Sequence, residues 1–311
     1  MSNVAADKAR AAGLTNLVCL ARYALIVVTL SAPLIRVAAQ TQDVVLVGAG
    51  DIGQCGPGNL ANALATATLI DAIPGTVFAA GDLGYPTGTD GDIAKCYASS
   101  WGRHRARTLP VPGEHDYVVP NAMGYFNYWG AAAGTPTKSY YSLNYGAWHI
   151  VVLNSECNNI RVGGCTAGSP QGQWLQADLA ANPAACTLAL WHRPLYTSTK
   201  SHVTTAVRPL WQILYNAKAD LVVNGSSHNY ERFAPQNANG NLDTTNGLVE
   251  FVVGTGGAPL ASFTTTAANS QVRNSSTYGV LKLTLHATSY DWQFVPIAGQ
   301  TFTDSGTQAC H

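Results

Sequence analysis

Charged side chains are scarce in this 311-residue chain, because only 11% of its residues are Asp, Glu, Lys or Arg, about half the usual fraction. The 17 basic and 17 acidic residues balance, and no basic stripe is present. Nucleic-acid binding through phosphate neutralisation therefore has little support, and no nucleic-acid partner is expected. Hydrophobic residues make up 47% of the chain, which argues against disorder.

Three further signatures are absent from the sequence. No internal repeat or linker divides the chain, so we expect residues 40–311 to form one large domain. No Cys-x-x-Cys spacing occurs, which argues against cysteine ligands for zinc. No Gly-x-Ser-x-Gly elbow surrounds Ser226, which argues against a serine hydrolase.

Long apolar runs are also missing, apart from Tyr23–Ile35 near the N-terminus, which follows Lys8, Arg10 and Arg22. Together with the small residues up to Ala39, this pattern predicts a signal peptide over residues 1–39 and a secreted or periplasmic protein. An uncleaved membrane anchor or a buried N-terminal helix is the alternative, although the run is short for a membrane span. After signal cleavage, no membrane association is expected.

The cysteine content supports export. Removal of residues 1–39 takes away Cys19 and leaves an even number of cysteines, which predicts disulfides in an exported chain. Six cysteines allow 15 connectivities. Cys157 and Cys165 flank a short Gly-rich loop and are the pair that we expect first. The six cysteines are Cys55, Cys96, Cys157, Cys165, Cys186 and Cys310.

Five short apolar runs each end in polar residues that can hold a metal. Strands of an α/β sheet carry ligands at their carboxyl ends, where the loops converge, so five such ends predict one site. Carboxylate and imidazole ligands suit a borderline or hard divalent or trivalent cation. The runs and the residues that follow them are Val44–Val47 with Asp51, Val77–Ala80 with Asp82, Leu109–Val111 with Glu114, His115 and Asp116, Leu188–Trp191 with His192, and Leu221–Val223 with Ser226 and His228.

The periodicity of the chain favours an α/β fold. The strand at Val44–Val47, a helix from Gly58 to about Ile73 and the strand at Thr76–Ala80 form a βαβ unit, which predicts parallel strands. Alternating residues at Tyr278–Leu285 and Ser289–Val295 predict an antiparallel hairpin at a sheet edge. Further strands are expected at Trp148–Leu153 and Glu250–Val253, and further helices at Gln171–Ala181 and Arg208–Ala217.

Read together, five motif blocks resemble those of the calcineurin-like metallophosphoesterases, in the same order. Tyr85 and the Asn229–Arg232 tail make the chain most similar to the purple acid phosphatase branch. The resemblance runs from about Val44 to the C-terminus. The blocks are Gly50-Asp51-Ile52-Gly53, Gly81-Asp82-Leu83-Gly84-Tyr85, Gly113-Glu114-His115-Asp116, His192 and Gly225-Ser226-Ser227-His228-Asn229-Tyr230-Glu231-Arg232.

The resemblance implies an α/β (α+β) fold, a four-layer α/β/β/α sandwich of two mixed β-sheets flanked by helices. It also implies one or two metal ions, with Fe, Zn or Mn expected. His115, backed by Asp116, would protonate the leaving oxygen or stabilise the transition state. Asp51, Asp82, Tyr85 and His228 would hold the first metal, and Asp82, Glu114, His192 and position 226 the second.

Two positions depart from the family, and both concern the second metal. The family has Asn where this chain has Glu114, and His where it has Ser226. A serine hydroxyl is a poor ligand for a transition metal, whereas Glu114 is a stronger anionic ligand than an amide. The second metal is therefore either held by Asp82, Glu114 and His192 with water, or missing.

The function implied is that of an exported metal-dependent phosphoesterase in which metal-bound hydroxide attacks phosphorus in line. We expect a phosphomonoesterase rather than a phosphodiesterase, acting on a phosphorylated small molecule or peptide. Arg193 or Arg232 is a candidate to face the phosphate. The alternative is a degenerate family member that binds one metal, or a phosphorylated ligand, without turnover.

Overall fold

The computed structural model describes residues 42–55, 59–159 and 161–311. The predicted signal peptide at residues 1–39 lies outside these ranges. Among the described helices, none is both long and apolar enough to span a membrane.

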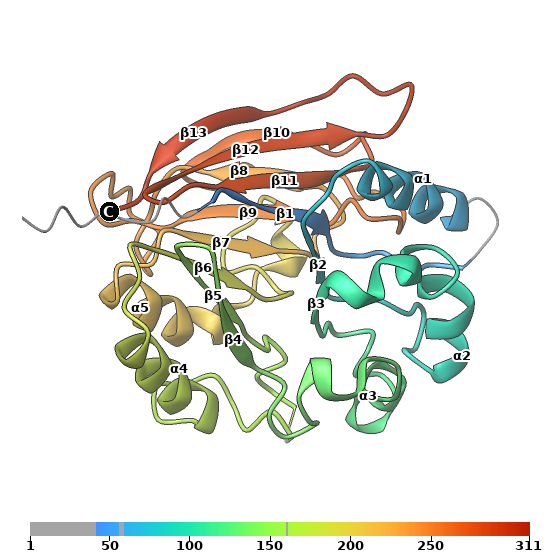
Figure 1. Ribbon diagram of the computed structural model, residues 1–311, viewed down its shortest axis with the longest axis horizontal. Helices are drawn as coiled ribbons and strands as arrows, with labels where there is room; N and C mark the ends of the chain where they lie inside the picture. The colour runs from blue at the N-terminus through green and yellow to red at the C-terminus, as the bar shows by residue number, and fades with distance from the viewer. Residues whose placement is uncertain (1–41, 56–58, 160) are drawn as a thin grey trace, which may run out of the picture. The chain divides into compact units, whose positions relative to one another are not determined.

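Two mixed β-sheets form the centre of the described chain, and helices lie on both sides of the pair (Figure 1). The larger apolar cluster contains buried side chains from both sheets, such as Val77 and Phe251, so the sheets pack face to face. The predicted α/β/β/α sandwich is therefore confirmed.

The first sheet has six strands in the order β13-β12-β11-β1-β2-β3. β1, β2 and β3 run parallel to one another, whereas β11, β12 and β13 are antiparallel to their neighbours. The continuous apolar sequence of β1 suits a strand that is covered on both faces. The strands are β1 (Val44–Ala49), β2 (Thr76–Ala80), β3 (Thr108–Val111), β11 (Gly279–Leu285), β12 (Ser289–Pro296) and β13 (Ser305–Ala309).

The second sheet has seven strands in the order β10-β8-β9-β7-β6-β5-β4. β5, β6, β7 and β9 are parallel, and antiparallel strands extend the sheet on both sides. The strands are β4 (Tyr141–Tyr145), β5 (Trp148–Val152), β6 (Cys186–Leu190), β7 (Leu221–Asn224), β8 (Tyr230–Phe233), β9 (Val249–Val253) and β10 (Ser270–Asn274).

Helices complete the outer layers (Figure 1). Trp211 of α5 and Leu175 of α4 share a second apolar cluster with Val151 and Val222 of the second sheet. α1 packs against β11 on the first sheet. The helices are α1 (Asn59–Asp71), α2 (Asp90–Asp92), α3 (Met123–Trp129), α4 (Pro170–Ala181) and α5 (Arg208–Asn216).

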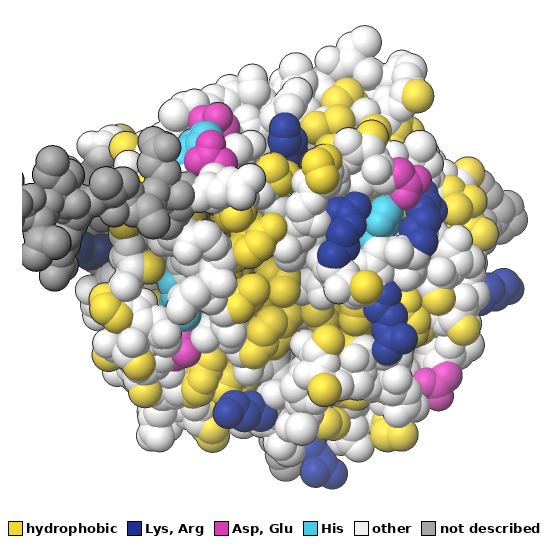
Figure 2. Space-filling model, in the orientation of Figure 1, with side chains coloured by type: hydrophobic (Ala, Val, Ile, Leu, Met, Phe, Trp, Pro, Cys, Tyr) yellow, Lys and Arg dark blue, Asp and Glu magenta, His cyan; other side chains and the backbone are white. Residues whose placement is uncertain are grey.

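The surface reflects the low charge content of the sequence. Most of the face in Figure 2 is uncharged, and its charged side chains are few.

Most predicted elements match the structure closely. The range predicted for β2 agrees at both ends, and the ranges predicted for α4 and α5 each differ by one residue at one end. The hairpin of β11 and β12 is also confirmed. Its predicted place at a sheet edge is wrong, because β11 lies between β1 and β12, and β13 forms the edge. The polar sequence of β13 carries too weak a hydrophobic signal for this to be predicted.

Three disulfides use all six cysteines that follow residue 39. The predicted pair Cys157–Cys165 is confirmed. Cys55–Cys96 joins the segment after β1 to the segment before β3, and Cys186–Cys310 joins β6 to the residues after β13. The last of these links the two sheets covalently.

A buried carboxyl group lies in the central strand β9. The Glu250 side chain is fully buried, and its Oε1 accepts only a long hydrogen bond, 3.5 Å, from the Tyr196 main-chain N–H. Oε2 has no hydrogen-bond partner in the described part of the chain. Burial, together with the nearby Glu231 carboxylate, raises the pKa of Glu250 well above its usual range. The folded chain therefore favours the protonated form of Glu250.

The first prediction concerns disulfide loop length. Cys186–Cys310 spans 124 residues and Cys157–Cys165 spans 8, so the longer loop removes more entropy from the unfolded chain. Replacing the Cys186–Cys310 pair by alanine should cost about 2 kcal/mol more unfolding free energy than replacing Cys157–Cys165. Urea unfolding of the two double variants measures this difference, and equal losses would contradict the expectation.

The second prediction concerns the pH dependence of stability. The pKa of Glu250 is higher in the folded chain than in the unfolded chain, where it is near 4.3, so Glu250 lowers the unfolding free energy as pH rises above about 4. Glu250→Gln lacks this titration. Its stability relative to the parent should therefore rise between pH 4 and pH 7. Urea unfolding at both pH values tests this, and a constant difference between the proteins would be evidence against a protonated Glu250.

Candidate metal centre

The carboxyl ends of five strands from both sheets deliver polar side chains to one place. Ligand atoms of Asp51, Asp82 and His192 all lie within 4.8 Å of one another, and all three side chains are buried. The structure therefore brings together residues that are far apart in the sequence. Asp51 follows β1, Asp82 and Tyr85 follow β2, Glu114, His115 and Asp116 follow β3, His192 follows β6, and Ser226 and His228 follow β7.

The Tyr85 hydroxyl lies at the centre of one group of donor atoms. It is 2.8 Å from Asp51 Oδ1 and 2.9 Å from Asp82 Oδ2. It also lies 3.0 Å from His228 Nε2, which is itself 3.1 Å from Asp51 Oδ1. These are the four residues predicted to hold the first metal.

Glu114 and His192 form a second group with Asp82. Nε2 of His192 lies 2.6 Å from Glu114 Oε2 and 3.4 Å from Asp82 Oδ2. The same Asp82 oxygen contacts the Tyr85 hydroxyl, so this carboxylate lies between the two groups. It occupies the place expected of a shared ligand.

Three histidines at the site share one orientation. Each has Nδ1 next to a main-chain carbonyl oxygen, which can only accept, so Nδ1 carries the hydrogen. Nε2 is left to face the site, as in histidines that bind metals. The pairs are His115 with Pro86 at 2.7 Å, His192 with Ala80 at 2.6 Å, and His228 with Pro259 at 2.8 Å.

Two observations fit bound cations better than hydrogen bonds alone. The Tyr85 hydroxyl has one hydrogen, yet carboxylate oxygens of both Asp51 and Asp82 lie 2.8 and 2.9 Å away. Nε2 of His192 is buried and has no hydrogen-bond partner in the described chain, although a Glu114 oxygen is 2.6 Å away. Lone pairs that face one another in this way repel unless a proton or a cation lies among them. The donor sets of both groups therefore fit a metal ion.

The charges at the site are strongly coupled. Burial alone would raise the pKa of Asp51. The facing His228 lowers this pKa by a larger amount, so the net shift is downward. Burial lowers the pKa of His228, but Asp51 outweighs burial and raises it to about 9. Likewise, Asp82 and Glu114 raise the pKa of His192 well above its usual range despite burial. Protons on these imidazoles stabilise the carboxylates, so a metal would compete with protons.

The backbone at the site is strained. Asp51, Asp82, Ser226 and His228 have φ angles of 58°, 56°, 70° and 50°, in the left-handed region that side-chain-bearing residues rarely adopt. The described chain contains eight such non-glycine residues, so half of them lie here. Clustered strain of this kind is typical of functional sites.

Two glycines permit the close approach of the loops. Gly81 has a φ of +85°, and a Cβ there would lie 2.3 Å from His192 Nδ1. A Cβ on Gly113 would lie 2.3 Å from Asp82 Oδ1. Side chains at either position would displace a candidate ligand.

The predicted pairing of Asp116 with His115 is wrong. The Asp116 carboxylate accepts hydrogen bonds from the main-chain N–H groups of Asp82 (3.1 Å), Leu83 (3.1 Å) and Gly113 (2.9 Å). The His115 ring instead bonds a main-chain carbonyl. Burial and the nearby Asp82 raise the pKa of Asp116 to about 7. Asp116 therefore holds the two motif turns together, and does not orient the His115 ring.

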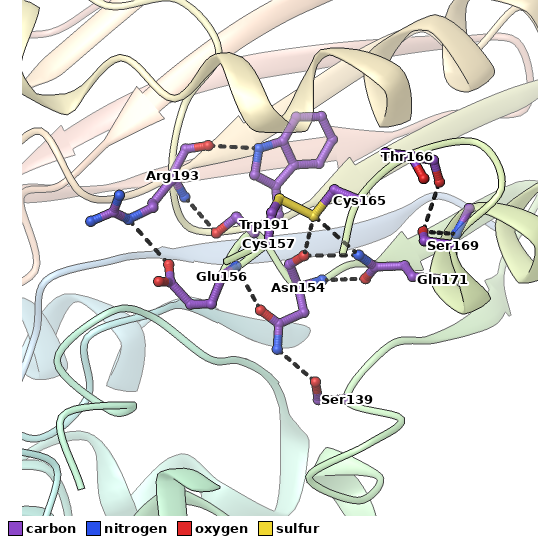
Figure 3. Close-up of a disulfide and its surroundings, with 12 residues drawn as sticks. Ser139, Asn154, Glu156, Cys157, Cys165, Thr166, Ser169, Gln171, Trp191 and Arg193 are labelled. Carbon is purple, nitrogen blue, oxygen red and sulfur yellow. Dashed lines mark hydrogen bonds and ion pairs between the residues drawn. A yellow bond between two sulfur atoms is a disulfide. The ribbon is translucent and has the colours of Figure 1, made fainter. Parts of the chain in front are cut away.

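The Cys157–Cys165 disulfide lies close to Glu156 and Arg193 (Figure 3). Next to Cys157, Glu156 Oε1 lies 3.1 Å from Arg193 Nε, which is also 3.3 Å from Glu114 Oε2. The Arg193 guanidinium therefore lies beside the second group and offsets its negative charge. Arg193 remains partly exposed and can meet a bound anion.

Arg232, the other predicted phosphate contact, is engaged elsewhere. Its Nε lies 2.7 Å from Asp304 Oδ2, and its guanidinium stacks 4.8 Å from the centre of a Trp292 ring. The sequence could not show this pairing, because Asp304 is distant along the chain.

His202 is a residue of the site that the sequence did not reveal. It ends the 3₁₀ turn Lys200–His202 between β6 and α5, and its Nδ1 lies 3.4 Å from Ser226 Oγ. Its ring centre is 6.1 Å from that of His228. One feature of the sequence could have pointed to His202, because it lies in the same connection between β6 and α5 as His192.

No family model matches the chain. Over 226 residues it is 26% identical to purple acid phosphatase 15 of Arabidopsis thaliana, covering 61% of this chain and 41% of that protein. Over 253 residues it is 26% identical to probable inactive purple acid phosphatase 1 of the same plant, covering 67% and 38%. The structure of a purple acid phosphatase from seeds of yellow lupin, Lupinus luteus, matches with a TM-score of 0.66 and 21% identity, covering 87% of this chain and 54% of that chain.

These similarities confirm the predicted resemblance to purple acid phosphatases and the fold of the calcineurin-like metallophosphoesterases. The chain spans less than half the length of the two curated relatives described above.

The third prediction concerns the turn held by Asp116. Asp116→Ala should leave three buried main-chain N–H groups without an acceptor, lower the unfolding free energy by roughly 2–5 kcal/mol and weaken metal binding at Asp82. Asp116→Asn keeps one acceptor oxygen and serves as the matched control, with a smaller loss. Urea unfolding and Zn titration measure both effects, and equal behaviour of the two variants would contradict this role.

Proposed function

We propose that this chain is an exported, metal-dependent phosphoesterase that hydrolyses phosphate esters. The observation that carries the proposal is the sharing of Asp82 between two donor groups, one with Asp51, Tyr85 and His228 and one with Glu114 and His192. Carboxylate, phenol and imidazole donors suit Fe, Zn or Mn. The sequence similarity to purple acid phosphatases supports the same reaction class.

Each group of residues has a distinct part in this proposal. A metal ion held by these residues supplies positive charge for the phosphate oxygens and lowers the pKa of a bound water. His115, with Nδ1 fixed by Pro86, presents Nε2 as the proton donor to the leaving oxygen. Its main-chain N–H donates to Asp82 Oδ1 at 2.9 Å, which ties the acid to the shared carboxylate.

The expected substrate is a phosphomonoester on a small molecule or peptide. Arg193 lies beside Glu114 and is partly exposed, so its guanidinium can donate hydrogen bonds to a phosphate oxygen. Export to the periplasm or the cell exterior agrees with the three disulfides, which persist in oxidising compartments.

A second candidate function is metal or phosphate-ligand binding without turnover. Ser226 and Glu114 favour it, because both depart from the family at the second metal. One relative is itself named a probable inactive phosphatase.

A direct assay separates the two candidates. The purified chain is incubated with p-nitrophenyl phosphate and with bis(p-nitrophenyl) phosphate, each with Mn, Zn, Fe or Mg. We expect hydrolysis of the monoester with at least one of Mn, Zn and Fe, loss with EDTA, and recovery when the metal is added back. His192→Ala should abolish activity, whereas His286→Ala, a distant histidine paired with Asp43 and Asp291, should not. Absence of turnover with every metal would favour the binding function.

The fourth prediction concerns the proton donor. His115→Ala should lower kcat by about 10²–10⁴-fold for an alkyl phosphate, whose leaving group needs a proton. The loss should be much smaller for p-nitrophenyl phosphate, whose leaving group does not. Metal content should be unchanged, because the main-chain N–H that contacts Asp82 remains. Equal losses on both substrates would show that His115 does not act as the acid.

A further inference from the structure

Glu156 is a largely buried carboxylate beside the site that has no part in the proposed chemistry. Its side chain is 14% exposed, and its Oε1 has no hydrogen-bond partner in the described chain, although Arg193 Nε lies 3.1 Å away. Burial raises the pKa of Glu156 to about 7, and the facing Arg193 opposes this rise. The guanidinium therefore favours the charged form of this carboxylate.

Arg193 lies between two carboxylates. Its Nε is 3.1 Å from Glu156 Oε1 and donates a hydrogen bond to Glu114 Oε2 at 3.3 Å. Its main-chain N–H donates to Ser155 Oγ at 3.0 Å, which fixes the start of the side chain. Within the described chain, neither terminal NH₂ group of the guanidinium donates a hydrogen bond, and the side chain is 36% exposed. The NH₂ donors are therefore available to an anion.

The loop that carries Glu156 is held rigidly (Figure 3). The main-chain N–H of Glu156 donates to Asn154 Oδ1 at 2.8 Å. Asn154 in turn exchanges two hydrogen bonds, of 2.7 and 2.9 Å, with the buried amide of Gln171. The next residue, Cys157, is bonded to Cys165. A fixed carboxylate is therefore presented to a long side chain that would otherwise sample many rotamers.

The second partner of Arg193 has another task. Glu114 is a candidate metal ligand, and a bound cation would draw its negative charge away from the guanidinium. Glu156 would then be the main partner that holds Arg193 in place.

We propose that Glu156 is a positioning residue, which holds the Arg193 guanidinium so that its terminal NH₂ groups meet the phosphate of the substrate. Paired donors of an arginine can bind two phosphate oxygens at once. A phosphomonoester carries more negative charge and more free oxygens than a diester, so this contact favours monoesters. The inference rests on the proposed function and names the residue that orients its phosphate contact.

Binding of inorganic phosphate tests the inference without reference to turnover. The parent chain, loaded with Mn²⁺, is titrated with inorganic phosphate in a calorimeter. Arg193→Ala should weaken binding by about 10–100-fold, because charge-assisted hydrogen bonds are lost. Glu156→Gln should weaken it by roughly 3–10-fold, because the guanidinium is released. Loss of a negative charge beside an anion site would by itself strengthen binding, so weaker binding reports positioning.

A second variant covers the case in which Glu156→Gln does not fold. Glu156→Asp withdraws the carboxylate from Arg193 and should show a smaller loss in the same direction. Unchanged or tighter phosphate binding in the folded Glu156 variants, or no phosphate binding by the parent, would overturn the proposal.

A double variant shows whether Glu156 acts through Arg193. In the Arg193→Ala background, Glu156→Gln should cause no further weakening. An equal loss in both backgrounds would give Glu156 a role that does not depend on Arg193 and would overturn the proposal. Asp71→Asn breaks a separate surface ion pair, with Arg103, and as the control should bind phosphate as the parent does.

Kinetics separate this inference from the proposed function. With p-nitrophenyl phosphate, Glu156→Gln should raise KM more than it lowers kcat, because binding is lost. Weaker phosphate binding in Glu156→Gln without hydrolysis by the parent would leave the inference intact and contradict the proposed function. Hydrolysis by the parent, with KM and phosphate binding unchanged in Glu156→Gln, would do the reverse.

Discussion

The repulsion among buried carboxylates where the two sheets meet is the constraint on which the site depends. Asp51 and Asp82 are fully or almost fully buried, and Glu114 lies beside them. Negative charges this close in a low dielectric are costly unless positive charge is placed among them. Imidazolium groups of His192 and His228 can meet this demand, as can metal ions, and the two carboxylate oxygens that face the single hydrogen of the Tyr85 hydroxyl favour a metal ion.

Candidate metal ligands also link the two sheets through hydrogen bonds. Asp51, from the first sheet, accepts the main-chain N–H of Ser226 from the second, and His192 donates to the carbonyl of Ala80. A third link between the sheets is the 2.8 Å hydrogen bond that the main-chain N–H of Gly50 donates to the carbonyl oxygen of Val253. Since the ligands sit on both sides of this junction, the packing of the sheets sets the positions of the donor atoms.

The positions of Asp51, Asp82, Glu114, His192 and His228 after short apolar strands predicted their convergence, whereas the sandwich and the role of Tyr85 were predicted from the family resemblance. Prediction from the sequence failed where contact depends on folding of distant segments. Nothing near His202 in the sequence shows that it meets Ser226, and nothing near Asp116 shows that it binds three main-chain N–H groups rather than His115. The edge strand β13 was missed because its polar residues lack the apolar pattern of buried strands.

The carbonyl partners of His115, His192 and His228 determine more than the position of a hydrogen atom. A ring that donates from Nδ1 to a fixed main-chain oxygen loses its freedom to flip. Each imidazole then needs little rearrangement when an ion arrives, so little conformational entropy is lost on binding. The pocket is thus preorganised by the backbone, and exchange of one ion for another would leave the protein framework nearly unchanged.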